Sequence, residues 1–182
     1  MIIGITGTLG AGKGTIVDYL KTKGFVHYSV RDFIVDEIKI LSLAVNRDNM
    51  VLVANKLRAE NSPSYIVEKL YESAREDGGL AVIESLRAVG EVEALQSKGK
   101  FYLLAVDAEI RKRYERILLR QSKTDNVSFQ EFVVNEKREM ISNDPAKQNI
   151  SQCINKADFV FENNGSFEDL EKKVEEVLQD IL

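Results

Sequence analysis

The chain has 182 residues, of which 44% are apolar and 30% charged, and its formal net charge is −4. This length suits a single domain with a sizeable core, and the apolar content excludes an intrinsically disordered chain. The acidic balance argues against a generic nucleic-acid binder, so any bound anion must be held by local groups. The single cysteine, Cys153, and the short apolar run at the N-terminus indicate a cytoplasmic protein without a disulfide or a membrane span.

Five short apolar runs alternate with longer helical patterns along the chain. These runs are residues 2–6, 25–29, 80–84, 101–107 and 158–161. Each run is nearly continuous in its apolar residues, which is typical of strands that are buried on both faces. Strands that alternate with helices predict a parallel sheet. We therefore expect an α/β fold of three layers, α/β/α, around a five-stranded parallel sheet, with residues 1–182 forming one domain.

Helical patterns begin near eight residues, which are Gly12, Asp32, Asn46, Ser62, Val89, Glu109, Ser128 and Ser166. Two of these starts resemble capping boxes, because Ser128 precedes Glu131 by three residues and Ser166 precedes Asp169 by three. Two stretches are longer than a minimal series of strands and helices requires. They are a mostly helical stretch, about 36–76, and a polar stretch, about 120–150, and both have the length of functional insertions.

A glycine-rich segment, residues 7–15, follows the first strand directly and opens the next helix. Its sequence is Gly-Thr-Leu-Gly-Ala-Gly-Lys-Gly-Thr. The glycines let successive backbone N–H groups face an anion, and the helix N-terminus adds partial positive charge. Lys13 supplies a full charge, and Thr15 supplies a hydroxyl for phosphate or Mg²⁺. We predict that ATP binds here, at Gly7, Thr8, Gly10, Ala11, Gly12, Lys13, Gly14 and Thr15.

Charged side chains follow the ends of several predicted strands. In an open parallel sheet these carboxyl ends form the crevice that holds ligands. Glu84 ends the third strand, and we predict that it contacts Mg²⁺, together with Thr15, or the acceptor; its alternative role is a helix cap or a salt bridge. Arginines suit phosphate recognition because their planar fork can make two parallel hydrogen bonds, and the candidate cations are Lys13, Arg31, Arg87, Arg116 and Arg120. We expect Arg111, Lys112 and Arg113 to form a solvated helix face instead.

These motifs resemble the P-loop nucleoside monophosphate kinases over nearly the whole chain. The loop 7–15, the segment 29–34 and Leu86-Arg87 with Glu91 are similar to adenylate kinases. The region of Arg47, Arg58 and residues 63–70 is similar to deoxynucleoside monophosphate kinases. The tail, residues 157–166, resembles both those enzymes and dephospho-coenzyme A kinases. Glu91 stands where adenylate kinases have the glutamine that reads adenine, so the resemblance does not point to adenosine monophosphate as the acceptor.

The resemblance implies the fold of P-loop nucleoside triphosphate hydrolases and transfer of a phosphoryl group from ATP, with Mg²⁺, to a nucleoside or deoxynucleoside monophosphate. The implied catalytic residues are Lys13, Arg87, Arg116, Arg120 and Asp32. The implied acceptor-binding residues are Ser29, Arg31, Arg47, Arg58, Arg87 and Glu91. Asn164 and Gly165 would lie beside the donor base. The stretch 36–76 would bind the acceptor, and 120–150 would be a lid.

Two other functions stay open. In a dephospho-coenzyme A kinase the acceptor is a ribose 3′-hydroxyl, and Asp32 would be the general base; its alternative role is a helix N-cap. A non-catalytic, nucleotide-sensing module is the third possibility, although several like charges near one loop favour an active site. We expect a small, nucleotide-like acceptor as partner, neither nucleic acid nor a membrane, and a monomer or homodimer.

Overall fold

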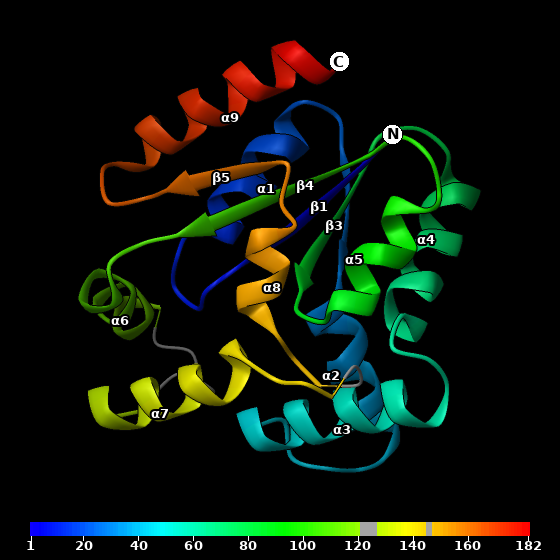
Figure 1. Cartoon of the computed structure of the whole chain (residues 1–182), viewed down its shortest axis with the longest axis vertical. Helices are drawn as coiled ribbons and strands as arrows, with labels where there is room; N and C mark the ends of the chain where they lie inside the picture. Colours follow the sequence, from blue (N-terminus) through cyan, green and yellow to red (C-terminus); the bar gives the residue numbers. More distant parts are fainter. Residues whose placement is uncertain (121–126, 145–146) are drawn as a thin grey trace.

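The computed structural model describes residues 1–120, 127–144 and 147–182 (Figure 1). Within these residues, five parallel strands form one sheet in the order β2-β3-β1-β4-β5. The strands are β1 (Ile2–Gly7), β2 (Val26–Ser29), β3 (Ala81–Leu86), β4 (Phe101–Asp107) and β5 (Phe159–Glu162). All five match predicted strands to within two residues at either end. The predicted five-stranded parallel sheet is therefore confirmed.

Helices cover both faces of the sheet, which confirms the three-layer architecture. On one face lie α1 (Lys13–Thr22) and α9 (Phe167–Ile181). On the other lie α4 (Tyr65–Asp77), α5 (Val89–Gln96) and α8 (Ile150–Asn155). Neighbouring side chains of β4 point to opposite faces, since Leu104 packs in the first core and Leu103 in the second. With six residues, α8 is too short to leave a periodic pattern, so it is not predicted from the sequence.

The three central strands end at the same edge of the sheet. Ile2 at the start of β1 pairs with Ala81 of β3 and with Phe101 of β4, so these strands run level. Beyond their carboxyl ends lie α2 (Val30–Ile40), α3 (Arg47–Glu60), α6 (Ile110–Leu119) and α7 (Phe129–Met140), in the lower half of Figure 1. This edge is the place where a ligand crevice is expected in a sheet of this type.

The two long stretches differ in how they join the core. In the stretch 36–76, Ile38, Val53 and Ile66 are buried in the same core as residues of the sheet. Much of this stretch is therefore a layer of the domain rather than a separate flap. The stretch 120–150 contributes α7, while residues 121–126 and 145–146 of the predicted lid lie outside the described part of the chain. Its role as a lid stays a prediction.

Helix starts follow local capping rules. Ser128 and Ser166 begin α7 and α9 with the predicted capping boxes, and Asn46 caps α3. The helix predicted near Asp32 begins two residues earlier, at Val30, and its N-cap is Ser29 rather than Asp32, because the Ser29 hydroxyl accepts a hydrogen bond from the Asp32 amide. In the described residues, no helix is long and apolar enough to cross a bilayer.

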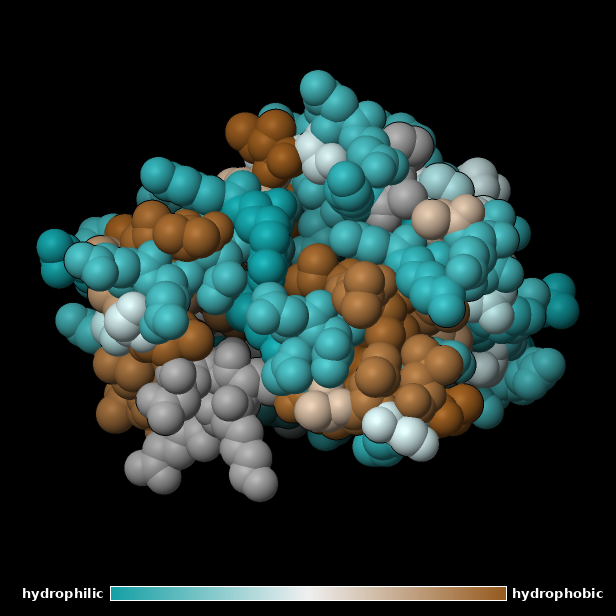
Figure 2. All heavy atoms as spheres, turned by 90° about the horizontal axis from the view of Figure 1, so that it is seen from below, coloured by the Kyte–Doolittle hydropathy of each residue, from teal (hydrophilic) through white to brown (hydrophobic). Residues whose placement is uncertain are grey.

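Among the apolar side chains exposed on the surface, one group lies together. Figure 2 shows them on the right of the face seen from below, over the turn between α2 and α3. The exposed large apolar residues of this turn and its flanking helices are Ile40, Leu41, Leu43, Val45 and Leu52.

Candidate functional site

The glycine-rich loop between β1 and α1 has a backbone that only glycine can adopt at two positions. Gly7 and Gly12 have φ angles of 138° and 119°. A β-carbon at Gly7 would lie 2.0 Å from the carbonyl oxygen of Val106. A β-carbon at Gly12 would lie 2.4 Å from Nδ2 of Asn163. The two glycines therefore allow both the turn of the loop and its close contact with β4 and the end of β5.

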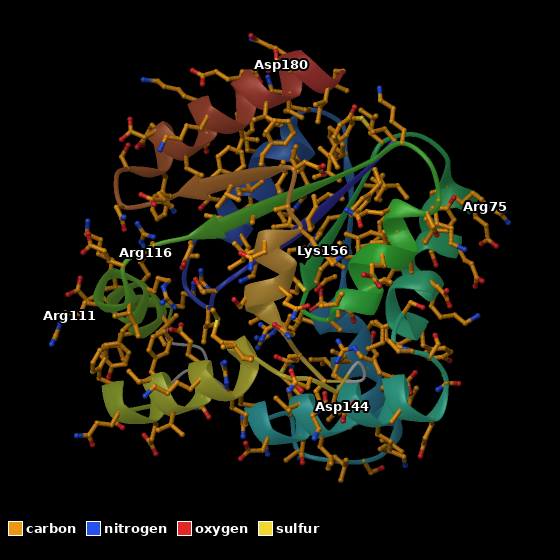
Figure 3. All side chains as sticks on the ribbon, viewed as in Figure 1. Arg75, Arg111, Arg116, Asp144, Lys156 and Asp180 are labelled. Carbon is orange, nitrogen blue, oxygen red and sulfur yellow. The ribbon has the colours of Figure 1, made fainter. Side chains whose placement is uncertain are left out.

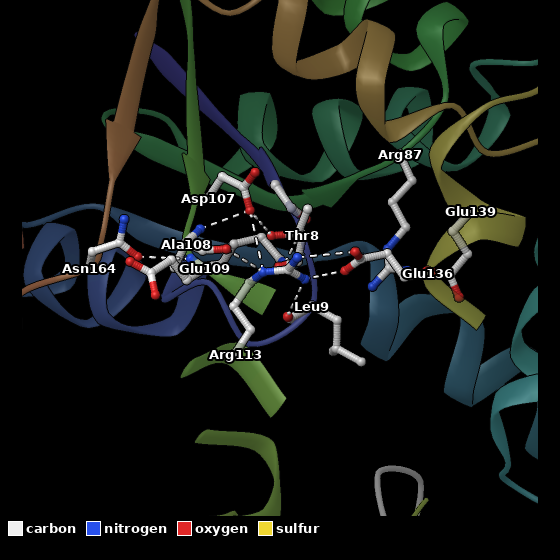
Figure 4. A network of polar contacts seen from close by, with 12 residues as sticks. Thr8, Leu9, Arg87, Asp107, Ala108, Glu109, Arg113, Glu136, Glu139 and Asn164 are labelled. Atoms are coloured by element: carbon white, nitrogen blue, oxygen red, sulfur yellow. Dashed lines mark hydrogen bonds and ion pairs between the residues drawn. The ribbon is translucent and has the colours of Figure 1, made fainter. Parts of the chain in front are cut away.

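Side chains from neighbouring elements hold this loop from the outside. Asn163 is buried, and its Nδ2 donates to the carbonyl oxygen of Ala11 at 2.7 Å. The Thr8 hydroxyl donates to Asp107 at the end of β4 at 2.5 Å. Arg113 of α6 contacts the carbonyl oxygen of Leu9 and forms an ion pair with Glu136 of α7 (Figure 4). Neither Asp107 nor Arg113 was predicted to serve the site.

Arg113 corrects the prediction that residues 111–113 form a solvated face. Its side chain is 5% exposed and donates to the carbonyl oxygen of Ala108 at 2.7 Å. Arg111, in contrast, is exposed and extends away from the molecule (Figure 3). Arg116 contacts the loop side, because its Nη2 donates to the carbonyl oxygen of Asn163 at 2.9 Å. Helical spacing thus separates these arginines into an outer and an inner set.

Lys13 is buried at the start of α1. Its Nζ donates to the carbonyl oxygens of Gly7 and Thr8, at 2.9 and 2.8 Å. Burial, assisted by the positive charge of Arg87, lowers the pKa of the Lys13 ammonium to about 7. A bound anion would favour the charged form again and raise this pKa. The loop therefore combines backbone donors with an ammonium group whose charge depends on an anionic ligand.

A cleft of about 650 Å³ opens in front of the loop, and we name it the donor cleft. It is lined by loop residues, by Phe167 and by the end of β3. Its described lining includes two carboxylates, Asp18 and Glu84. It also includes five cations, which are Lys13, Arg31, Arg87, Arg116 and Arg120. The fold thus brings together the whole predicted set of cations. A polyphosphate is the kind of ligand that such a cleft would attract.

Thr15 and Glu84 both line the donor cleft, as predicted for a magnesium site. A hydroxyl and a carboxylate fit Mg²⁺, which binds few protein oxygens and completes its shell with phosphate oxygens and water. In the described part of the chain, no group of three or more His, Cys, Asp or Glu side chains could hold a metal ion. The donor set therefore fits a metal that arrives with a phosphate ligand.

Ser85, near the end of β3, has a strained backbone conformation. Its φ angle is 73°, which is uncommon for a residue other than glycine. It sits at the irregularity in β3 where the pairing with β1 shifts register, and its hydroxyl donates to Glu84 at 2.6 Å. Backbone strain of this kind is often found at functional sites.

A second cavity, which we name the acceptor cavity, adjoins the donor cleft. It is about 40 Å³ in volume and shares Arg31, Ser85 and Arg87 with the donor cleft. Its other lining residues come from α2, α3, α7 and the segment before α8, and they are Val30, Ile34, Arg47, Met50, Val51, Arg58, Glu139 and Gln148. The predicted acceptor residues Arg31, Arg47, Arg58 and Arg87 are therefore gathered in one place.

Glu139 of α7 lies between two of these arginines. Its carboxylate accepts from Nη2 of Arg47 at 2.7 Å and from Nη1 of Arg87 at 2.5 Å. The Glu139 side chain is only 3% exposed, and Figure 4 shows it facing Arg87. A carboxylate thus occupies the position in which two arginines could hold the anion of a ligand. Glu139 is not predicted from the sequence, because it is far along the chain from both arginines.

Glu91 is not available to a substrate, which corrects its predicted role. It is fully buried, and its Oε1 accepts from Nε and Nη2 of Arg58 at 2.9 and 2.6 Å. Its Oε2 accepts from the backbone amides of Arg87 and Ala88, at 2.9 and 3.0 Å. Glu91 therefore positions the turn after β3 and one wall of the acceptor cavity.

Seven other predicted residues do not line the donor cleft or the acceptor cavity. Ser29 caps α2, and Asp32 in its first turn is exposed. Asn164 accepts a hydrogen bond from the Glu109 amide at 2.8 Å, which ties the turn after β5 to α6, and Gly165 is exposed. Gly7, Thr8 and Ala11 belong to the loop but contact the protein behind it.

The same architecture occurs in known proteins. Residues 3–142 match the family described as AAA domain. The chain is 30% identical to a UPF0200 protein of Methanocaldococcus jannaschii, covering all of this chain and 91% of that protein. It is similar in structure to shikimate kinase of Bacteroides thetaiotaomicron, with a TM-score of 0.59, 13% identity and 98% of each chain covered. For dephospho-CoA kinase of Campylobacter jejuni the TM-score is 0.55 at 19% identity, over 99% and 96% of the chains. At these identities, the two structures show a shared P-loop kinase fold.

Proposed function

Given that this chain belongs to the AAA domain family and to the UPF0200 proteins, we propose that it is an ATP-dependent kinase. Its acceptor is a small molecule that carries a phosphate, of the class of nucleoside or deoxynucleoside monophosphates. The observation that carries this proposal is the shared wall of the two cavities, formed by Arg31, Ser85 and Arg87. A phosphoryl group can pass between two phosphates only if both reach the same few positive groups.

The reaction follows from this arrangement. An oxygen of the acceptor phosphate attacks the γ-phosphorus of ATP and forms the new P–O bond. The bond from the γ-phosphorus to the bridging oxygen breaks, and ADP leaves with the electron pair. Both reactants are anions that repel each other, so catalysis consists mainly of positioning and charge neutralisation. Lys13, Arg87, Arg116 and Arg120 supply that neutralisation from the walls of the donor cleft.

Thr15 and Glu84 would hold Mg²⁺ together with the nucleotide phosphates, and the ion would neutralise part of their charge. Ser85 orients Glu84 through its hydrogen bond to the carboxylate. The stretch 120–150, with α7, would act as the lid that excludes water during transfer. The buried Cys153 and the absence of other cysteines support the proposal of a cytoplasmic enzyme.

The position of Asp32 favours a phosphate acceptor over a hydroxyl acceptor. A hydroxyl must lose a proton to a nearby base, whereas a phosphate dianion needs none. Asp32, the base expected for the dephospho-coenzyme A reaction, is exposed and lines neither cavity. The third possibility, a nucleotide-sensing module, has the same donor cleft but no acceptor-dependent turnover.

One assay separates these functions. The purified protein is incubated with Mg-ATP and, in turn, with nucleoside monophosphates, deoxynucleoside monophosphates and dephospho-coenzyme A, and the release of ADP is followed. We expect ADP release that depends on a monophosphate and yields a diphosphate. Release only with dephospho-coenzyme A would contradict the phosphate acceptor, and no acceptor-dependent release would contradict the kinase.

A further inference from the structure

Arg58 is a buried arginine in the acceptor cavity, and its guanidinium is only partly hydrogen-bonded. Its side chain is 1% exposed, and Nε and Nη2 form a fork on Glu91. Nη1 is buried and has no hydrogen-bond partner among the described residues. Because the guanidinium is planar, Nη1 lies at the edge away from this fork. Arg58 also lines the acceptor cavity, and Nη1 is the nitrogen of its guanidinium that has no partner among the described residues.

The orientation of this donor is fixed by Glu91. One carboxylate oxygen of Glu91 holds the guanidinium of Arg58, and the other accepts from the backbone amides of Arg87 and Ala88. One buried residue therefore sets the position of Nη1 relative to the turn that carries Arg87. A donor that is buried, rigid and unpaired is unfavourable until a ligand atom accepts from it.

The other walls of the cavity indicate the shape of that ligand. Val30, Ile34, Met50 and Val51 make an apolar surface, and positive charge is gathered at Arg87 and its neighbours. The occupant should therefore be anionic at one end and apolar in its middle, with one hydrogen-bond acceptor near Arg58. A nucleotide has this pattern, because the edge of its base carries polar atoms and its faces are apolar.

We propose that Arg58 determines acceptor specificity by donating a hydrogen bond from Nη1 to an oxo oxygen of the acceptor's base. The proposal rests on the proposed function, and it narrows the acceptor to a nucleoside monophosphate with an oxo group at that edge. An amino group at the same position of the base is itself a donor and cannot accept a hydrogen bond from Nη1. Both Nη1 and the amino group would then lack a hydrogen-bond partner. A site built around a substrate hydrogen bond rejects analogues that lack it.

The cavity of about 40 Å³ has room for only a few atoms, so a whole base enters only when its walls separate. Glu139 closes one side, where it binds Arg47 and Arg87. An acceptor phosphate that binds Arg47 and Arg87 replaces Glu139 as their partner. When Glu139 is released, α7 can move away from the cavity, and the ring of the base can enter. Binding of the phosphate and opening of the base site are therefore coupled.

Isothermal titration calorimetry on the whole protein tests this proposal with two matched pairs of ligands. Uridine and cytidine monophosphate form one pair, and inosine and adenosine monophosphate form the other; an oxo group in the first member of each pair replaces an amino group in the second. The titrations compare the wild-type protein with a double variant that carries both Arg58→Met and Glu91→Gln. In this double variant both members of the buried ion pair are neutral. The control is Lys156→Met with Glu93→Gln, which removes an exposed ion pair of 2.9 Å between α5, the helix that carries Glu91, and the end of α8.

For wild type, we expect the oxo member of at least one pair to bind roughly tenfold more tightly or better. The double variant at 58 and 91 should lose this preference, whereas the control variant should keep it. Equal binding within both pairs would overturn the proposal, and so would a preference that survives in the folded double variant. If that variant does not fold, 4-thiouridine monophosphate replaces it as the test on wild type, because sulfur is a weak acceptor. Undiminished binding of the thio ligand would then overturn the proposal.

Calorimetry needs no phosphoryl transfer, so the two proposals can fail separately. An oxo preference without ADP release would contradict the kinase and leave the role of Arg58 standing. ADP release without an oxo preference would contradict the role of Arg58 alone.

Discussion

The donor cleft and the acceptor cavity are neighbours, but they are built from different parts of the chain. The loop of the donor cleft is a contiguous segment whose backbone turns at Gly7 and Gly12 and whose charge is Lys13. The acceptor cavity is made of side chains from α2, α3, β3 and α7, and buried glutamates hold its arginines. A site made of local backbone can be recognised from sequence, whereas one made of distant side chains depends on the fold.

The donor cleft and the acceptor cavity also differ in how their charged side chains are neutralised. In the donor cleft, the hydrogen bonds that Lys13 makes within the described part of the chain go to neutral carbonyl groups, and burial lowers its pKa. In the acceptor cavity, Glu91 and Glu139 already neutralise arginines before any ligand arrives. Substitutions in the donor cleft should therefore lower activity and leave stability unchanged. Substitutions in the buried ion pairs of the acceptor cavity should lower stability as well.

Lys13→Met gives the largest expected effect. The ammonium that faces the transferred phosphate is lost, so kcat should fall by roughly 10²–10³-fold. The melting temperature should not fall, because the substitution removes a buried charge that forms no ion pair with a carboxylate among the residues that the structure describes. Lys21→Met, at an exposed lysine of the same helix, should behave like wild type in both respects. Near-normal turnover of Lys13→Met would remove the loop from the mechanism.

Glu91→Gln should have the next largest effect, on stability. The substitution leaves Arg58 buried without its counter-charge, which should lower the free energy of unfolding by roughly 3 kcal/mol. Urea denaturation measures this loss. The matched control is Glu93→Gln, two residues away on α5, whose exposed ion pair with Lys156 should matter little. A loss in Glu91→Gln no larger than in the control would mean that the buried pair does not support the cavity.

Arg87→Ala should change the kinetics of the two substrates unequally. Arg87 lines both cavities, but its guanidinium lies between the acceptor-side groups Glu139 and Gln148. We expect the acceptor KM to rise by about 10–100-fold and the KM of ATP to change much less. Steady-state kinetics with each substrate varied in turn gives both values. Equal changes in the two KM values would contradict the assignment of Arg87 to the acceptor.

Proton uptake on nucleotide binding is the smallest expected effect. The pKa of Lys13 in the folded protein is about 7, below its ordinary value, so the unfolded chain binds more protons between that pH and about 10.5. The contribution of Lys13 to stability therefore rises with pH across this window. At about pH 8.5, ATP should raise this pKa and draw a proton from the buffer.

Calorimetric titrations in two buffers of different ionisation enthalpy measure this uptake. Wild type should take up a larger fraction of a proton than Lys13→Met, which has no ammonium to titrate. The same proton uptake in both proteins would show that Lys13 does not change its charge when the nucleotide binds.

The sequence predicted the fold well because strands buried on both faces leave continuous apolar runs, and capping boxes such as that of Ser128 are local. It predicted the cations of the donor cleft because strand ends meet at one edge of a parallel sheet. It could not show that Arg113 is buried under the loop, because the partner of Arg113 is Glu136, on another helix. Glu91 was misassigned for the same reason, since only the fold places Arg58 beside it.

The central claim is that a phosphoryl group passes from the donor cleft to a phosphate in the acceptor cavity. The most direct measurement supplies ATP with a radiolabelled γ-phosphate, Mg²⁺ and a nucleoside monophosphate, and then separates the products by chromatography. We expect the label to appear in the nucleoside diphosphate with wild type, and Arg87→Ala to transfer far less at the same acceptor concentration. Label that stays in ATP, or that appears only as free phosphate with every monophosphate, would contradict transfer between the two cavities.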